Sequence, residues 1–126
     1  MVVAGLAFAG LAAVLHVFIF YLESMAWTTR ARAVFGTTAQ EAEATREMAF
    51  NQGFYNLFLA ITVGLGIVLH AAGQQAVAAT LVLTGAGSMV AASLVLLLSS
   101  PDKASAAIKQ GALPAVGVAL LVVGLL

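Results

Sequence analysis

Four apolar runs, each about as long as a bilayer is thick, dominate the sequence. A helix needs about 20 apolar residues to cross roughly 30 Å of hydrocarbon. The runs predict spans at about residues 2–26, 50–72, 76–98 and 105–126 of one domain that covers residues 1–126. Because lipid offers backbone groups no hydrogen-bonding partner, each span is expected to be helical. The sequence therefore predicts an all-α, four-helix transmembrane bundle.

The composition also favours lipid as the outer solvent. The chain is 63% hydrophobic and 8% charged, whereas soluble domains are about 45–50% apolar and about 25% charged. A net charge of zero, with five basic residues, argues against a nucleic-acid partner, which requires a dense cationic face. The absence of cysteine excludes disulfides, thiolate nucleophiles and iron–sulfur sites.

The basic residues predict how the bundle is oriented. All five fall on one side of the predicted spans: Arg30, Arg32, Arg46, Lys103 and Lys109. The two termini and the short link at residues 73–75 carry no basic residue. The positive-inside rule therefore predicts that the basic side faces the cytoplasm and that both termini lie on the non-cytoplasmic side.

The segment between spans one and two contains a helix start. The run Thr38-Ala39-Gln40-Glu41 has the pattern of a capping box, which predicts a helix that begins at Ala39. This helix is expected to continue into span two over about 32 residues, or roughly 48 Å at 1.5 Å per residue. The second transmembrane helix is therefore expected to extend into the cytoplasm.

Span one carries two ionisable side chains on one stripe. His16 and Glu23 are seven residues apart, so they fall within about 20° of each other around a helix, and Trp27 continues the stripe. Polar groups inside a bilayer are costly and face the bundle interior. A purely structural alternative makes His16 an interhelical hydrogen-bond partner and Glu23 an interfacial anchor.

Span two opens with four hydrogen-bonding side chains in six residues: Asn51, Gln52, Tyr55 and Asn56. Gly53 lies on another side of that helix and allows close approach of a second helix. Lys109 and Gln110, near the start of span four, are expected at the same depth as Glu23. An unpaired carboxylate at this depth is costly, so Glu23 is expected to bond with Lys109 or with the first two amides of span two.

These side chains together predict a polar funnel that opens to the cytoplasm and narrows at His16. The predicted lining is His16, Glu23, Trp27, Asn51, Gln52, Tyr55, Asn56, Lys109 and Gln110. The expected ligand is a small polar or amphiphilic molecule, bound for transport or for chemistry in the membrane, with no catalytic residue assigned. No metal and no cofactor are predicted. His16 and His70 lie at different depths, which argues against a shared haem iron, and His16 with Glu23 gives too few metal ligands.

Span three carries small residues at helical spacing, namely Thr80, Thr84, Gly87 and Ala91. This pattern favours close helix packing, either within the bundle or between the subunits of a homo-oligomer. An alternative to the ligand-binding function is therefore a structural or accessory subunit of a larger membrane complex, in which polar residues only hold helices together.

Two resemblances add to these predictions. The run from His16 to Glu23 with Trp27, the run Asn51-Gln-Gly-Phe-Tyr-Asn56 and Gln110-Gly111 together resemble the domain-of-unknown-function 1304 family of small bacterial membrane proteins. That resemblance implies four membrane helices, in a bacterial cytoplasmic (inner) membrane, and no particular activity. Arg46, Asn51, Tyr55 and the run at 58–60 are similar to the second-helix signature of the membrane enzymes of eicosanoid and glutathione metabolism, which implies a glutathione-dependent trimer as a further alternative.

Overall fold

A computed structural model describes residues 1–126. It contains helices and no strand, so the predicted all-α class is confirmed. Four of the helices are long and apolar enough to cross a membrane. The elements are α1 (Val2–Ser24), α2 (Arg30–Phe35), α3 (Ala39–Ala71), α4 (Gln75–Ser99), the 3-10 turn η1 (Pro101–Lys103) and α5 (Ala104–Leu125).

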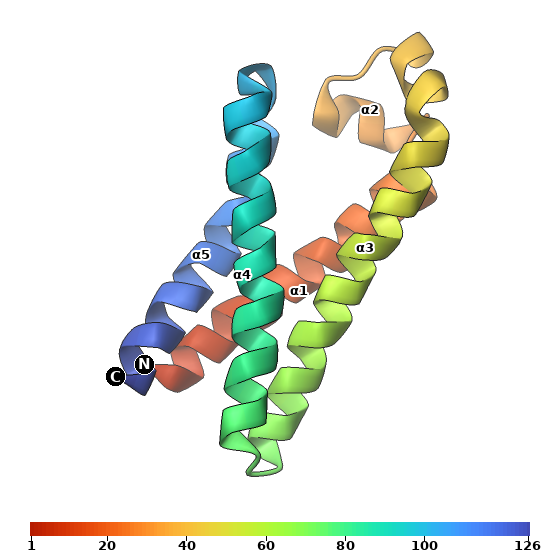
Figure 1. The fold of residues 1–126 in the computed structure, drawn as a ribbon. Coiled ribbons are helices and arrows are strands. Elements are labelled where there is room, and N and C mark those ends of the chain that lie inside the picture. The colour runs from red at the N-terminus through yellow and green to blue at the C-terminus, as the bar shows by residue number, and fades with distance from the viewer.

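The four long helices form a bundle in which the chain direction alternates from one helix to the next (Figure 1). α1 packs against α3 and α5, and α4 packs against the same two helices, so α1 and α4 lie diagonally across the bundle. Both termini lie at the end that holds the α3–α4 turn. The short helix α2 and the α4–α5 link lie at the opposite end, toward which α3 and α4 diverge.

Small residues bring α1 and α5 into close contact. A Cβ atom on Gly5 would lie 2.7 Å from the backbone nitrogen of Leu121, and a Cβ atom on Gly117 would lie 2.9 Å from that of Ala9. Only glycine permits such an approach, which increases the van der Waals contact between helices that lipid itself cannot drive together. The adjoining core of ten buried residues is rich in alanine and has Met89 as a large, fully buried side chain.

The predicted capping box begins α3. The Glu41 backbone N–H donates to Oγ1 of Thr38 at 3.2 Å, and the Thr38 backbone N–H donates to Oε2 of Glu41 at 3.1 Å. Each bond satisfies an amide that lacks a partner in the first helical turn. The helix begins at Ala39 as predicted and continues without interruption for 33 residues to Ala71.

The end of α1 differs from the sequence-based boundary. The predicted first span reaches residue 26, but α1 ends at Ser24, where the Ala26 backbone N–H bonds five residues back to Tyr21. The chain then turns into α2, which the sequence did not predict because six residues are too few for a periodic signal. Gly36, with φ of 66°, ends α2 in the left-handed conformation that glycine adopts without strain.

The small-residue stripe of α4 faces outward. Thr80, Thr84 and Ala91 are exposed, and a Cβ atom on Gly87 would meet nothing within 4 Å. The buried face of α4 is instead formed by Ala78, Val82, Gly85, Ala86, Met89 and Ser93. The stripe therefore does not pack within this chain, and its use between subunits of a homo-oligomer stays a prediction.

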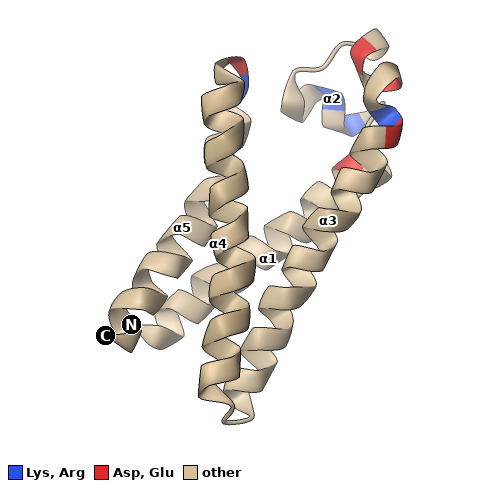
Figure 2. Ribbon diagram, viewed as in Figure 1, with Lys and Arg blue, Asp and Glu red and all other residues tan.

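The charged residues gather at the α2 end of the bundle (Figure 2). All ten occur in residues 23–47 and 102–109, which lie at the end of α1, in α2, in the first turns of α3 and around the α4–α5 link. The half of the bundle that holds both termini carries none, so the two ends of this molecule differ sharply in polarity.

Candidate functional site

A hydrogen bond between Glu23 and Asn56 links the end of α1 to α3. The Asn56 side-chain amide donates to Oε2 of Glu23 at 2.8 Å and also contacts the backbone oxygen of Gln52 at 3.3 Å. Both the carboxylate and the amide residue are half-buried. The predicted partners of Glu23 were wrong. The Asn51 amide donates instead to the Glu47 backbone oxygen of its own helix, at 3.1 Å.

Gly53 explains why α1 and α3 meet closely enough for this bond. A Cβ atom on Gly53 would overlap the Ser24 hydroxyl and would lie 3.1 Å from the backbone oxygen of Phe20. The Ser24 hydroxyl itself donates to the backbone oxygen of Phe50 at 2.8 Å. The prediction that Gly53 allows close approach of another helix is thereby confirmed, and the contact brings Asn56, one turn further along α3, to Glu23.

Trp27 holds the turn after α1 against α3. Because α1 ends at Ser24, Trp27 does not continue the helical stripe of Glu23, as the sequence had suggested. Its indole N–H donates to Oγ1 of Thr45 at 3.0 Å, and the Thr45 hydroxyl donates to the Glu41 backbone oxygen at 2.7 Å. Its ring also packs against Phe35 of α2, with centroids 5.4 Å apart. Trp27 therefore joins three elements at the charged end.

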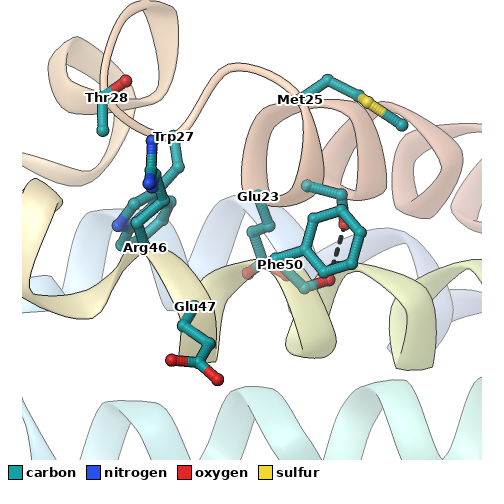
Figure 3. A pocket seen from close by; sticks show the side chains of 8 residues that line it. Glu23, Met25, Trp27, Thr28, Arg46, Glu47 and Phe50 are labelled. Atoms are coloured by element: carbon teal, nitrogen blue, oxygen red, sulfur yellow. Dashed lines mark hydrogen bonds between the residues drawn. The ribbon is translucent and has the colours of Figure 1, made fainter.

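A cavity of about 550 Å³ lies between the end of α1, the following turn and the first turns of α3 (Figure 3). Its lining combines carboxylates, a guanidinium, hydroxyls and aromatic rings: Glu23, Ser24, Met25, Trp27, Thr28, Arg46, Glu47 and Phe50. We call it the Glu23 cavity. A smaller cavity of about 230 Å³ also borders Glu23 and Trp27, together with Thr45, Met48, Ala49 and Gln52.

His16 lies apart from these cavities. It is 2% exposed, and its Nδ1 lies 2.8 Å from the backbone oxygen of Ala12, four residues earlier in α1. None of the five main cavities has His16 in its lining. The structural alternative is also not what the structure shows, because this bond stays within one helix and does not join two helices.

Two further predicted residues of α3 point away from Glu23. Tyr55 is 64% exposed, and Asn51 is exposed with its amide bonded to its own helix. Both lie on the outer side of the helix whose inner side carries Gly53 and Asn56. The structure therefore brings together Glu23, Trp27, Gln52 and Asn56, and it leaves Tyr55 and Asn51 outside that group.

Lys109 and Gln110 lie on a different face of α1 from Glu23. They border a mainly apolar space of about 260 Å³, which we call the α1–α5 groove. Its lining is Leu15, Phe18, Ile19, Leu22, Val34, Phe35, Ala106, Lys109 and Gln110. No residue is shared between this groove and the Glu23 cavity. A single funnel that includes both Glu23 and Lys109 is therefore not present in the structure.

Several lining residues were missed by the sequence reasoning, which considered only the polar groups inside the predicted spans. They are Ser24, Thr28, Thr45, Arg46, Glu47 and Phe50. A signal for one side of α3 was present, because residues 45, 49, 52 and 56 recur at the spacing of a single helical face. Extending the amide stripe back along that face would have found Thr45.

The side chains of this site can form hydrogen bonds, pair with charges and stack on apolar groups. Glu23 and Glu47 accept hydrogen bonds, Arg46 donates them, and the rings of Trp27 and Phe50 offer apolar faces. No group of three His, Asp or Glu side chains is arranged to hold a metal ion. This combination suits the binding of a molecule with both polar and apolar parts.

The fold and composition define a small helical membrane protein whose polar residues gather at one end. Residues 10–122 match the family model described as "Protein of unknown function (DUF1304)", and the chain belongs to that family. The expected family membership is thereby confirmed over most of the chain. Searches of curated proteins and of solved structures found no match.

Proposed function

We propose that the chain is a single-domain, multi-pass protein of the bacterial cytoplasmic membrane that binds a small polar or amphiphilic molecule in the Glu23 cavity. The cavity would open to the cytoplasm and serve transport of that molecule or chemistry at the membrane. The observation that carries this proposal is the half-buried Glu23 carboxylate, held by Asn56 at the edge of a cavity of about 550 Å³.

The distribution of charge supports the orientation. The five Lys and Arg residues lie at the α2 end, and the end with both termini has no charged side chain (Figure 2). A bias of Lys and Arg in short loops places those loops in the cytoplasm. The Glu23 cavity lies at that same end, so its mouth is expected to face the cytoplasm.

The bonding of Glu23 supports a role in ligand binding. A carboxylate has about four acceptor positions, and the side chain of Glu23 receives one hydrogen bond from the protein, donated by Asn56. Polar groups at membrane depth are costly, and those that persist there are most often functional. The remaining acceptor positions are available to a donor group of a ligand in the cavity.

The mixture of lining groups supports an amphiphilic ligand. Trp27 and Phe50 offer apolar rings, and Arg46 and Glu47 offer charges of both signs on the same cavity. Ligand pockets typically combine apolar walls with a few polar groups that fix orientation. A compound with a hydrogen-bond donor for Glu23 and an apolar part for the rings satisfies both halves of this lining.

A comparison of two asparagines on the same helix tests the proposal. Asn56 bonds to Glu23, whereas Asn51 bonds only within α3. The wild-type protein, Asn56→Ala, Glu23→Gln and the control Asn51→Ala would be purified in nanodiscs, and the retained small molecules would be quantified by mass spectrometry after denaturation. We expect Asn56→Ala and Glu23→Gln to retain at least about tenfold less of a wild-type compound, the loss expected for one charged hydrogen bond, while Asn51→Ala retains it.

The accessory-subunit alternative predicts a different result. In that case no compound is enriched on the wild-type protein relative to an unrelated membrane protein, and Asn56→Ala lowers only stability in detergent. The trimeric glutathione enzyme predicts retained glutathione and a trimer by native mass spectrometry. Either pattern would refute the proposed use of the Glu23 cavity.

A further inference from the structure

The α1–α5 groove is a second candidate binding site, on the face of α1 that turns away from the Glu23 cavity. Leu15, Ile19 and Leu22 of α1 form one wall, and Val34 and Phe35 of α2 close one end. From Leu15 to Leu22 the groove follows α1 for about 10 Å at 1.5 Å per residue. Its walls are apolar, except for Lys109 and Gln110 of α5.

Lys109 is the unusual member of this lining. Its side chain is exposed beside the groove, and the one ion pair in the chain joins two other residues, Arg46 and Glu43. Lys109 therefore has no carboxylate partner within the chain. It lies six residues into α5 from the charged end, so its ammonium reaches membrane depth or snorkels along the groove toward the surface.

The surroundings of the groove are also basic. Arg30 and Arg32 belong to α2, which closes the groove, and Arg30 donates to the Tyr21 hydroxyl of α1 at 3.2 Å. The ring of Tyr21 stacks against Phe18 of the groove wall, with centroids 6.1 Å apart. The nearby acidic side chains lie elsewhere, four of them on the α3 side of the bundle: Glu23, Glu41, Glu43 and Glu47.

The mobile end of the groove is fixed by a long-range bond. Lys103 of η1 donates to the backbone oxygen of Phe35 at 3.1 Å, and this bond holds α2 next to the α4–α5 link. The groove thus has three connected walls from α1, α2 and α5. An apolar channel with a lysine at its polar end matches a molecule with an apolar chain and an anionic head.

We infer that the α1–α5 groove binds an anionic phospholipid of the leaflet on the charged side of the bundle. One acyl chain lies along Leu15, Ile19 and Leu22, and the phosphate lies at Lys109 with Arg30 nearby. Anionic lipids are attracted to basic groups at the cytoplasmic surface, and the lipid supplies the negative charge that the chain does not provide to Lys109. This site shares no residue with the Glu23 cavity, so either proposal can fail alone.

Native mass spectrometry with added lipid tests this inference. The purified protein would be titrated with phosphatidylglycerol and, separately, with phosphatidylcholine of the same acyl chains. We expect tighter binding of phosphatidylglycerol. Lys109→Gln should weaken that binding about fivefold, the factor that corresponds to about 1 kcal/mol per basic group near an anionic surface. Lys109→Arg should retain the preference, because it keeps the charge.

Two further variants separate a specific site from general attraction. Arg46→Gln removes a basic group from the opposite side of the charged end and should leave phosphatidylglycerol binding unchanged. Val34→Trp fills the groove from its 43% exposed wall residue and should reduce binding while Lys109 remains. Equal binding of both lipids, equal losses in Lys109→Gln and Arg46→Gln, or full binding by Val34→Trp would each show only ordinary bilayer lipid and overturn the inference.

Discussion

The ammonium of Lys103 donates a hydrogen bond to the backbone oxygen of Phe35, the last residue of α2, at 3.1 Å. The two residues are 68 positions apart in the sequence. The backbone oxygens in the last turn of a helix lack partners and carry partial negative charge. A cation from the α4–α5 link therefore stabilises the end of a six-residue helix that has little else to hold it.

Removing this cation should loosen α2 and leave the four long helices intact. We expect Lys103→Gln to speed amide hydrogen exchange across residues 30–37 about fivefold, because a charge at a helix C-terminus contributes about 1 kcal/mol. Exchange in α1 and α4 should stay at the wild-type rate. Asp102→Asn is the control, since the neighbouring Asp102 makes no such bond. Equal exchange in the two variants would contradict a tethering role for Lys103.

Asn56→Ala should also lower stability, independently of any ligand. The substitution removes the hydrogen bond to the half-buried carboxylate of Glu23, and a bond to a charged group contributes about 1.5–3 kcal/mol. We expect the free energy of unfolding in mixed detergent to fall by that amount. Asn51→Ala should change it by less than about 0.5 kcal/mol, as for other exposed positions. A similar loss for both variants would mean that the Glu23 bond adds nothing specific.

Gly53→Ala tests the close contact between α1 and α3. The added methyl group would collide with Ser24 and with the backbone oxygen of Phe20, so we expect a loss of about 1–3 kcal/mol in unfolding free energy. Gly64→Ala is the matched control on the same helix, because a Cβ atom there meets nothing within 4 Å.

The control should be neutral or slightly stabilising, since alanine is favoured over glycine in a helix by about 1 kcal/mol. Thermal unfolding followed by circular dichroism distinguishes the two variants. A Gly53→Ala protein as stable as Gly64→Ala would show that α1 and α3 are less closely packed than the structure indicates.

The helices were predictable because their signals are local. Apolar length alone predicts four spans, and the capping box at Thr38 marks the start of α3 to the residue. Gly53 was also recognisable, since a glycine beside polar groups in a membrane helix usually permits a close contact. The missed α2 is too short for a periodic pattern, and only Gly36 at its end carried a signal.

The site was only partly predictable, because the sequence does not fix how helices turn toward one another. Several groups lie at a depth similar to that of Glu23, and the choice between Asn56 and Lys109 depends on which face of α1 meets α3 and which meets α5. Trp27 was expected on a helical stripe, yet it reaches the same cavity from the turn that follows α1. Such a turn depends on tertiary contacts with Thr45 that local periodicity cannot encode.

The proposed orientation can be measured with single cysteines, because the chain has none of its own. Gln74 lies at the α3–α4 turn and Asp102 in the α4–α5 link, at opposite ends of the bundle, and both are exposed. In intact spheroplasts, a membrane-impermeant maleimide should label Gln74→Cys and leave Asp102→Cys unlabelled, since basic loops remain in the cytoplasm. Both variants should react once the membrane is opened, which controls for accessibility. The reverse pattern would turn the Glu23 cavity toward the outside, and a cytoplasmic ligand could then no longer reach it.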